Sequence, residues 1–93
     1  MISNEIIEEI KKKANIVDII SSYIPLTKKG RNYFGLCPFH DDHSPSMSVS
    51  PEKNIYTCFV CGATGNAITF VMNYENVSYL EALKILANKL GIT

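Results

Sequence analysis

The sequence has no net charge, because nine lysine and arginine residues balance nine aspartate and glutamate residues over 93 positions. Bulk charge therefore gives no indication of a nucleic-acid partner. The sequence also lacks an apolar run long enough to span a bilayer, and it shows no secretory signal. We expect no membrane contact and a cytoplasmic location, where thiols stay reduced.

Cysteine is scarce and odd in number, since the chain has three. An odd count argues against a disulfide framework, although buried small hydrophobic cysteines, or one disulfide with a spare thiol, remain alternatives. Each cysteine lies in a turn-like context, with Pro38 beside one group and Gly62 beside the other. These contexts favour metal ligands over core packing.

The spacing of four residues predicts a zinc ribbon. Cys37 and His40 enclose two residues, Cys58 and Cys61 enclose two more, and residues 41–57 separate the pairs. Two tight turns of this kind can supply the closed tetrahedral shell of a structural Zn²⁺ site, which leaves no position for a catalytic water. His43 is a competing fourth ligand, but its longer gap from Cys37 suits the turn less well, so we expect it at the surface.

One zinc ion would matter greatly to a chain of this length, because a small domain buries a limited fraction of its surface. A structural zinc site couples metal binding to folding by roughly 10 kcal/mol or more, which is comparable with the whole stability of an ordinary domain. The sequence therefore predicts that chelation unfolds much of the chain.

Helical periodicity is found at both ends of the chain. Apolar residues predict an amphipathic helix over 3–14, followed by a short helix that Asn15 caps and Pro25 ends. A helix is predicted from Asn66 to Asn73 or slightly beyond. Ser78 opens a capping box for a final apolar helix that ends at Gly91.

The middle of the chain instead predicts a small antiparallel sheet. Segments 26–28 and 32–36 flank a hairpin turn at Lys29-Gly30, and Met47 and Val49 alternate with serines in a further strand. A turn at 51–54 leads into a strand at 55–57. The predicted fold is α+β: a single zinc-binding domain over 1–93, with N-terminal helices at 1–25, the zinc ribbon sheet at 26–62 and C-terminal helices at 63–93.

The sheet region also carries the ingredients of a single-strand nucleic-acid site, namely cations for phosphates and rings on which bases stack. The candidates are Lys28, Lys29, Arg31, Lys53, Tyr33, Phe34, Tyr56 and Phe59. Strand alternation means that Tyr33 and Phe34 cannot both face solvent, so about half of the rings belong to the core. Arg31 is the strongest candidate, because a guanidinium both pairs with phosphate and stacks on a base. A solvated hairpin remains the alternative for the cations, and Asn32 and Asp42 are either polar contacts or turn residues.

Several ordered motifs resemble the N-terminal zinc-binding domain of bacterial replicative DNA primases. They are RNYFGLCPFH at 31–40, SPS at 44–46, SPEK at 50–53, CFVCG at 58–62 and Gly65-Asn66, and the likeness extends to NIVDII at 15–20. The resemblance implies a domain that reads single-stranded DNA template for an enzyme that makes short RNA primers. It also implies that the chain is a fragment, since the family has an RNA polymerase domain with catalytic Mg²⁺ and a domain that docks on the replicative helicase.

Catalysis by these 93 residues is not expected. Phosphoryl transfer needs clustered carboxylates for Mg²⁺, and the only acidic pair in the ribbon, Asp41-Asp42, is more typical of a turn. Two other classes stay open: a protein-interaction zinc ribbon that docks through its first or last helix, and a redox switch in which oxidation of Cys58 and Cys61 ejects the metal.

Overall fold

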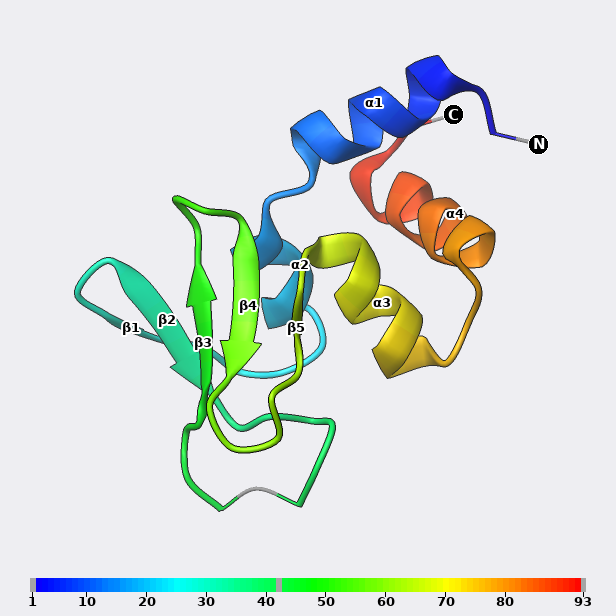
Figure 1. Cartoon of the computed structure of the whole chain (residues 1–93). Helices are drawn as coiled ribbons and strands as arrows, with labels where there is room; N and C mark the ends of the chain where they lie inside the picture. The colour runs from blue at the N-terminus through cyan, green and yellow to red at the C-terminus, as the bar shows by residue number, and fades with distance from the viewer. Residues whose placement is uncertain (1, 42, 93) are drawn as a thin grey trace.

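The computed structural model describes residues 2–41 and 43–92, so Asp42 lies outside the described residues. Within them, two N-terminal helices precede a sheet of five strands, and two further helices follow it (Figure 1). The elements in chain order are α1 (Asn4–Lys13), α2 (Ile16–Ser21), β1 (Thr27–Lys29), β2 (Asn32–Gly35), β3 (Met47–Ser50), β4 (Ile55–Cys58), β5 (Thr64–Gly65), α3 (Ala67–Glu75) and α4 (Tyr79–Leu90).

Each of these helices begins at a capping side chain that accepts a hydrogen bond from a free backbone N–H of the first turn. Asn15 Oδ1 accepts from Val17 N at 3.0 Å, and Ser78 Oγ accepts from Glu81 N at 3.2 Å. Ser3 and Asn66 cap α1 and α3 in the same way. The predicted helix starts are therefore confirmed, whereas α2 ends at Ser21, before Pro25.

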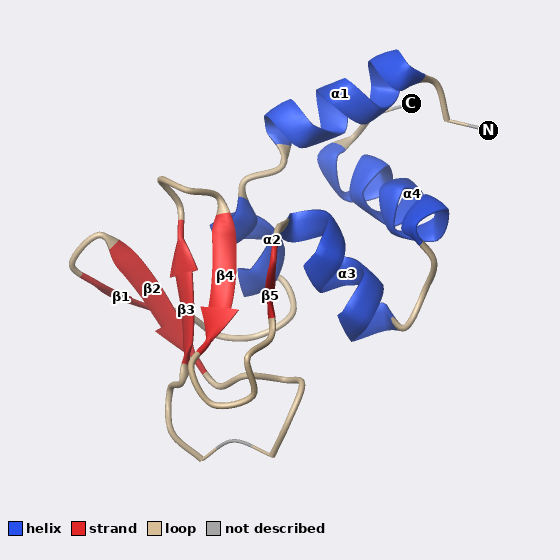
Figure 2. Ribbon diagram, viewed as in Figure 1, coloured by secondary structure: helices blue, strands red, loops and turns tan. Residues whose placement is uncertain are grey.

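The strands form one antiparallel sheet in the order β1-β2-β3-β4-β5, which confirms the α+β class (Figure 2). Lys29 pairs with Asn32, so Gly30 and Arg31 form the hairpin turn, one residue later than predicted. Gly30 has φ +66°, a conformation that favours glycine at the first turn position. Strand β5 was not predicted, and it lies in the segment assigned to the C-terminal helices.

One face of the sheet packs against the helices. Met47, Val49 and Tyr56 point to this face and are fully buried with residues of α2 and α3, among them Ile20 and Phe70. Helix α4 packs on α3 and α1 and closes the helical side, as Figure 1 shows. No described helix covers the opposite face, which is therefore open. Among the described residues, no helix has the length and apolar character needed to cross a membrane.

Candidate metal centre and the open sheet face

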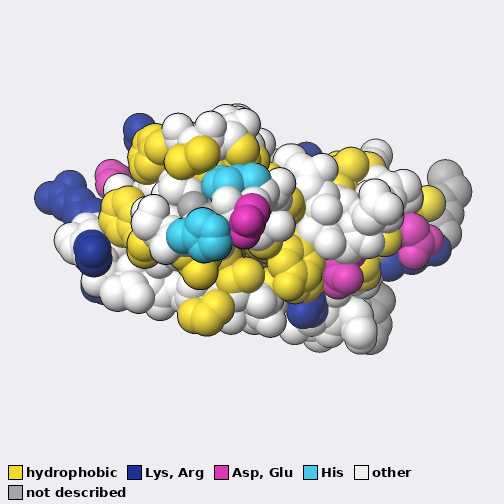
Figure 3. All heavy atoms as spheres, turned by 90° about the horizontal axis from the view of Figure 1, so that it is seen from below, with side chains coloured by type: hydrophobic (Ala, Val, Ile, Leu, Met, Phe, Trp, Pro, Cys, Tyr) yellow, Lys and Arg dark blue, Asp and Glu magenta, His cyan; other side chains and the backbone are white. Residues whose placement is uncertain are grey.

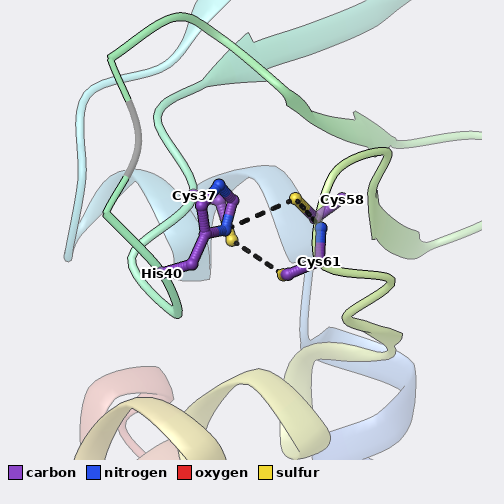
Figure 4. A group of neighbouring side chains, drawn as sticks. All are labelled: Cys37, His40, Cys58 and Cys61. Carbon is purple, nitrogen blue, oxygen red and sulfur yellow. Dashed lines mark hydrogen bonds between the residues drawn. The ribbon is translucent and has the colours of Figure 1, made fainter.

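The register of the sheet brings two loops that are distant in sequence to the same end of the sheet. Met47 pairs with Gly35 on one side and with Cys58 on the other, so β2 and β4 end at the same level. Cys37 and His40 lie in the loop after β2, whereas Cys58 ends β4 and Cys61 follows in the next turn. Figure 4 shows the four side chains converging from these two loops.

The loop that carries Cys37 and His40 is anchored by the residue between them. The Phe39 ring lies 5.3 Å from the Phe70 ring and 6.1 Å from the Tyr56 ring, centroid to centroid. Offset and edge-on contacts at such distances are the favoured geometry for aromatic pairs. The Phe39 ring thus anchors the first ligand loop to the hydrophobic core.

The ligand atoms fit one tetrahedral ion. All four lie within 4.8 Å of one another, with Cys37 Sγ 3.7 Å from Cys61 Sγ and Cys58 Sγ 3.8 Å from His40 Nδ1. Two sulfurs at about 2.3 Å from a tetrahedral Zn²⁺ are about 3.8 Å apart, whereas a disulfide needs about 2.05 Å. The Cys37 and Cys61 sulfurs therefore match zinc ligands and exclude a disulfide between them, and the predicted zinc-binding site is confirmed.

The protein environment shifts the pKa values of the two buried thiols, Cys37 and Cys58, in opposite directions. Burial raises the pKa of Cys37, and the neighbouring Cys58 and Cys61 side chains raise it further against an opposing backbone N–H of Phe39. Burial also opposes ionisation of Cys58, but hydrogen bonds from backbone N–H groups of Cys61 and Val60 and from the Ser46 hydroxyl offset it and lower the pKa of Cys58. Since zinc binds thiolates, loading the site displaces protons, and of these two thiols Cys58 is the more ready to ionise.

His43 is not part of the ligand cluster. Its side chain is 87% exposed, and its Nε2 lies 3.6 Å from Oδ2 of the 92% exposed Asp41 side chain. The expectation that His43 lies at the surface is confirmed.

Seen from below, this end of the molecule shows hydrophobic side chains around the two histidines (Figure 3). Leu36, Phe59 and Val60 are the large exposed hydrophobic residues of the two ligand loops and their flanks.

The open face of the sheet has a distinct composition. Strand pairing and alternation place on it Thr27, Lys29, Asn32, Phe34, Ser48, Ser50, Ile55, Thr57 and Thr64. The Thr57 and Thr64 hydroxyls lie 3.4 Å apart, in agreement with this register. Small serines therefore occupy the central strand, and larger side chains stand on the strands at either side.

A hollow of about 340 Å³ lies over this serine strand. Its lining includes Ser48 and Ser50, the apolar side chains of Ile55 and Phe59, and the cations Arg31 and Lys53, with Asn32, Glu52 and Thr57 completing it. Phe59 is 72% exposed, so its ring is available to a ligand at one end of the hollow.

The predicted nucleic-acid residues are not all on this face. Lys29, Arg31, Phe34, Lys53 and Phe59 lie on the open face or at its rim. Lys28 and Tyr33 point to the helix side, where they line a second hollow with Val17 and Asp18 of α2. Arg31 and Glu52 line both hollows.

Tyr56 requires a correction. Its side chain has no exposed surface, and its ring packs edge-on against Phe70 with centroids 5.4 Å apart. It belongs to the core, so the prediction that it offers a ring to a base is wrong. The reason is its position in β4, where Tyr56 points to the same face as the buried Cys58.

Two features of the site were not predicted. The alternation of Met47 and Val49 with serines indicated which side chains of β3 share a face, but Ser48 and Ser50 were given no binding role. Ser46 was also missed as a partner of Cys58, although its Oγ lies 3.5 Å from Cys58 Sγ. Only the register of β3 against β4 brings these two residues together.

Comparison with known proteins agrees with the geometry. The model of a family described as the CHC2 zinc finger matches residues 2–93. The chain is 55% identical to a DNA primase of Geobacillus stearothermophilus over 98% of its length and 53% identical to one of Clostridium acetobutylicum over 100%. It covers only 15% and 16% of those relatives.

A solved structure of the Aquifex aeolicus primase, containing its zinc-binding and RNA polymerase domains, superposes with a TM-score of 0.89 at 48% identity. The match covers 99% of this chain and 23% of the Aquifex chain.

Proposed function

Because the chain belongs to the CHC2 zinc finger family, we propose that it is the zinc-binding part of a DNA primase and that its open sheet face binds single-stranded DNA template. The relatives that share about half of its residues carry the name DNA primase. The chain spans less than a sixth of the first of them, so primer synthesis is a proposal about a longer enzyme.

The observation that carries the template proposal is the hollow over the serine strand. Small hydroxyl side chains form its floor, Phe59 and Ile55 stand at its side, and Arg31 and Lys53 reach it as cations. Single strands are bound by such a combination of a cationic groove with rings on which unpaired bases stack. Phe34 and Lys29 extend the same face towards β1.

The zinc ion has a structural role in this proposal. Its four protein ligands leave no open position for a reacting water, so the centre holds the two loops and supplies no chemistry. Phosphoryl transfer then belongs to an RNA polymerase domain with its own Mg²⁺, and helicase docking to a further domain of a cytoplasmic enzyme. The work of this part is to hold the template in place.

The protein-interaction alternative has weaker support. Docking through the last helix would need an exposed apolar stripe on α4, but Ala82, Leu83 and Leu86 of that helix are fully buried against the core. Leu80 is the exposed leucine of that helix within the part of the chain that the structure describes. The helix is therefore used largely for packing.

A pair of neighbouring lysines tests the assignment to the open face. Lys29→Ala removes a cation of this face, whereas Lys28→Ala removes one that points to the helix side. We expect Lys29→Ala to weaken binding of a fluorescent single-stranded DNA at low salt and to reduce the salt slope by about 0.7, the contribution of one phosphate contact. Lys28→Ala should change neither quantity.

Phe59→Ala is the matching test of base stacking. The ring is exposed, so its removal should leave folding intact but lower DNA affinity by about 1–3 kcal/mol, roughly 5- to 150-fold. Fluorescence anisotropy measures the affinity, and zinc content and melting temperature confirm the fold. Unchanged affinity in both Phe59→Ala and Lys29→Ala would refute the open face as the template site.

A further inference from the structure

Ser46 is an unusual residue of the metal-binding end of the molecule. It is 8% exposed and is the one polar residue in the buried set of the described chain. It lies immediately before β3, between the two ligand loops in sequence. Burial of a hydroxyl is unfavourable unless the group forms a hydrogen bond.

The hydroxyl and the backbone carbonyl of Ser46 are both directed at the second ligand loop. Its hydroxyl oxygen lies 3.5 Å from Cys58 Sγ, and its backbone carbonyl accepts a hydrogen bond from Phe59 N at 3.0 Å. A metal-bound thiolate has lost its proton and only accepts hydrogen bonds. With zinc in place, the Ser46 hydroxyl is therefore the donor, beside the Cys61 N–H that lies 3.5 Å from the same sulfur.

We propose that Ser46 is a positioning residue of the zinc centre, whose hydroxyl donates to the Cys58 thiolate and thereby tightens the hold on the metal and lowers the reactivity of that sulfur. Three thiolates and a neutral imidazole around Zn²⁺ carry a net charge of about −1, and a donor to sulfur stabilises that charge where water is excluded. The inference concerns the metal alone and stands whether or not the open face binds DNA.

Ser46→Ala removes the hydroxyl with little change in volume, and Ser48→Ala is its matched control. Ser48 lies two residues further along β3 on the open face, away from the ligand cluster. Loss of such a supporting hydrogen bond weakens metal binding by about 10- to 100-fold. Competition with a chromophoric chelator should show this weakening for Ser46→Ala, with Ser48→Ala within about twofold of the parent chain.

Cobalt substitution separates this role from general loss of stability. The energy of the thiolate-to-cobalt charge-transfer band depends on the electron density at sulfur, which a hydrogen bond lowers. The band of Co²⁺-loaded Ser46→Ala should therefore move to longer wavelength, whereas that of Ser48→Ala should stay in place. Ser46→Thr keeps the hydroxyl and should restore both the band position and the zinc affinity.

The proposal is overturned if Ser46→Ala keeps the parent band position and zinc affinity. If Ser46→Ala does not fold even with excess zinc, the cadmium-loaded parent chain decides. Scalar coupling between the bound cadmium and the Ser46 hydroxyl proton supports the hydrogen bond, and a Ser46 hydroxyl that exchanges freely with no such coupling contradicts it.

Discussion

Cys61 contributes to the stability of this molecule through its sulfur atom. Unlike Cys37 and Cys58 it is exposed, so its side chain adds little to the hydrophobic core, yet its sulfur lies in the ligand cluster. The effect of replacing it therefore reports almost entirely on the metal.

Cys61→Ser should lose stoichiometric zinc and destabilise the fold by more than about 3 kcal/mol, a part of the roughly 10 kcal/mol or more that a structural zinc site contributes. Val60→Ser is the control, because Val60 is 68% exposed in the same turn and is not a ligand. Metal analysis and thermal melting measure both effects. A zinc-loaded Cys61→Ser that melts like the parent chain would remove Cys61 from the ligand set.

At the scale of residues, the four zinc ligands were predictable because their spacing alone restricts them to two tight turns. Ser46 and Tyr56 were not, since their roles depend on three-dimensional neighbours. Tyr56 is an aromatic residue of a strand and has the composition of a stacking platform, but the face to which it points is set by the register of β4. A residue type thus indicates what a side chain can do and not whether it is exposed.

At the scale of elements, the turn between β3 and β4 holds the N-terminal helices in place through Asn54. The Asn54 Oδ1 accepts a hydrogen bond from Ile16 N at 3.1 Å, and its Nδ2 donates to Ala14 O at 3.4 Å. Asn54 also has φ +59°, a left-handed conformation that asparagine adopts more readily than most residues. One side chain thus connects the junction of α1 and α2 to the sheet.

Asn54→Ala should lower the free energy of unfolding by about 2 kcal/mol, since it removes a cap on Ile16 and adds strain at a positive φ. Asn54→Gly loses the same hydrogen bonds but relieves the strain, so it should recover about 1 kcal/mol. Urea denaturation of the zinc-loaded chains measures the difference. Equal stability of the alanine variant and the parent chain would show that this connection does not hold the helices.

Helices were predictable at this scale because caps and apolar periodicity are local signals. Asn15 and Ser78 cap as expected, and Ser3 and Asn66, predicted as helix starts, are the caps of α1 and α3. Strand β5 was not, because it has two residues and exists only through pairing with β4. Gly65 also depends on tertiary context, since a Cβ there would lie 2.7 Å from the Thr69 side chain. Short elements that tertiary contacts define leave little trace in the sequence.

At the scale of the whole molecule, one ion joins two loops that belong to opposite sides of a central strand. The helices cover one face of the sheet and leave the other open, and the four ligand residues lie at the end of the sheet where β2 and β4 finish. The spacing of the four ligands predicted the zinc, and hydrophobic periodicity predicted the general architecture. The structure was needed to show which cations and rings share the open face, because neighbours in sequence such as Lys28 and Lys29 point to opposite sides.

We expect zinc to hold the two ligand loops together and the fold to depend on it. The most direct measurement is an amide NMR spectrum of the chain, recorded with zinc bound and again after a chelator has removed the metal, with metal content determined on both samples. This dependence on zinc predicts that the dispersed spectrum of the zinc-loaded chain collapses for β2, β3 and β4 on chelation and returns when zinc is added. A metal-free chain that keeps the dispersed spectrum of these strands would contradict it.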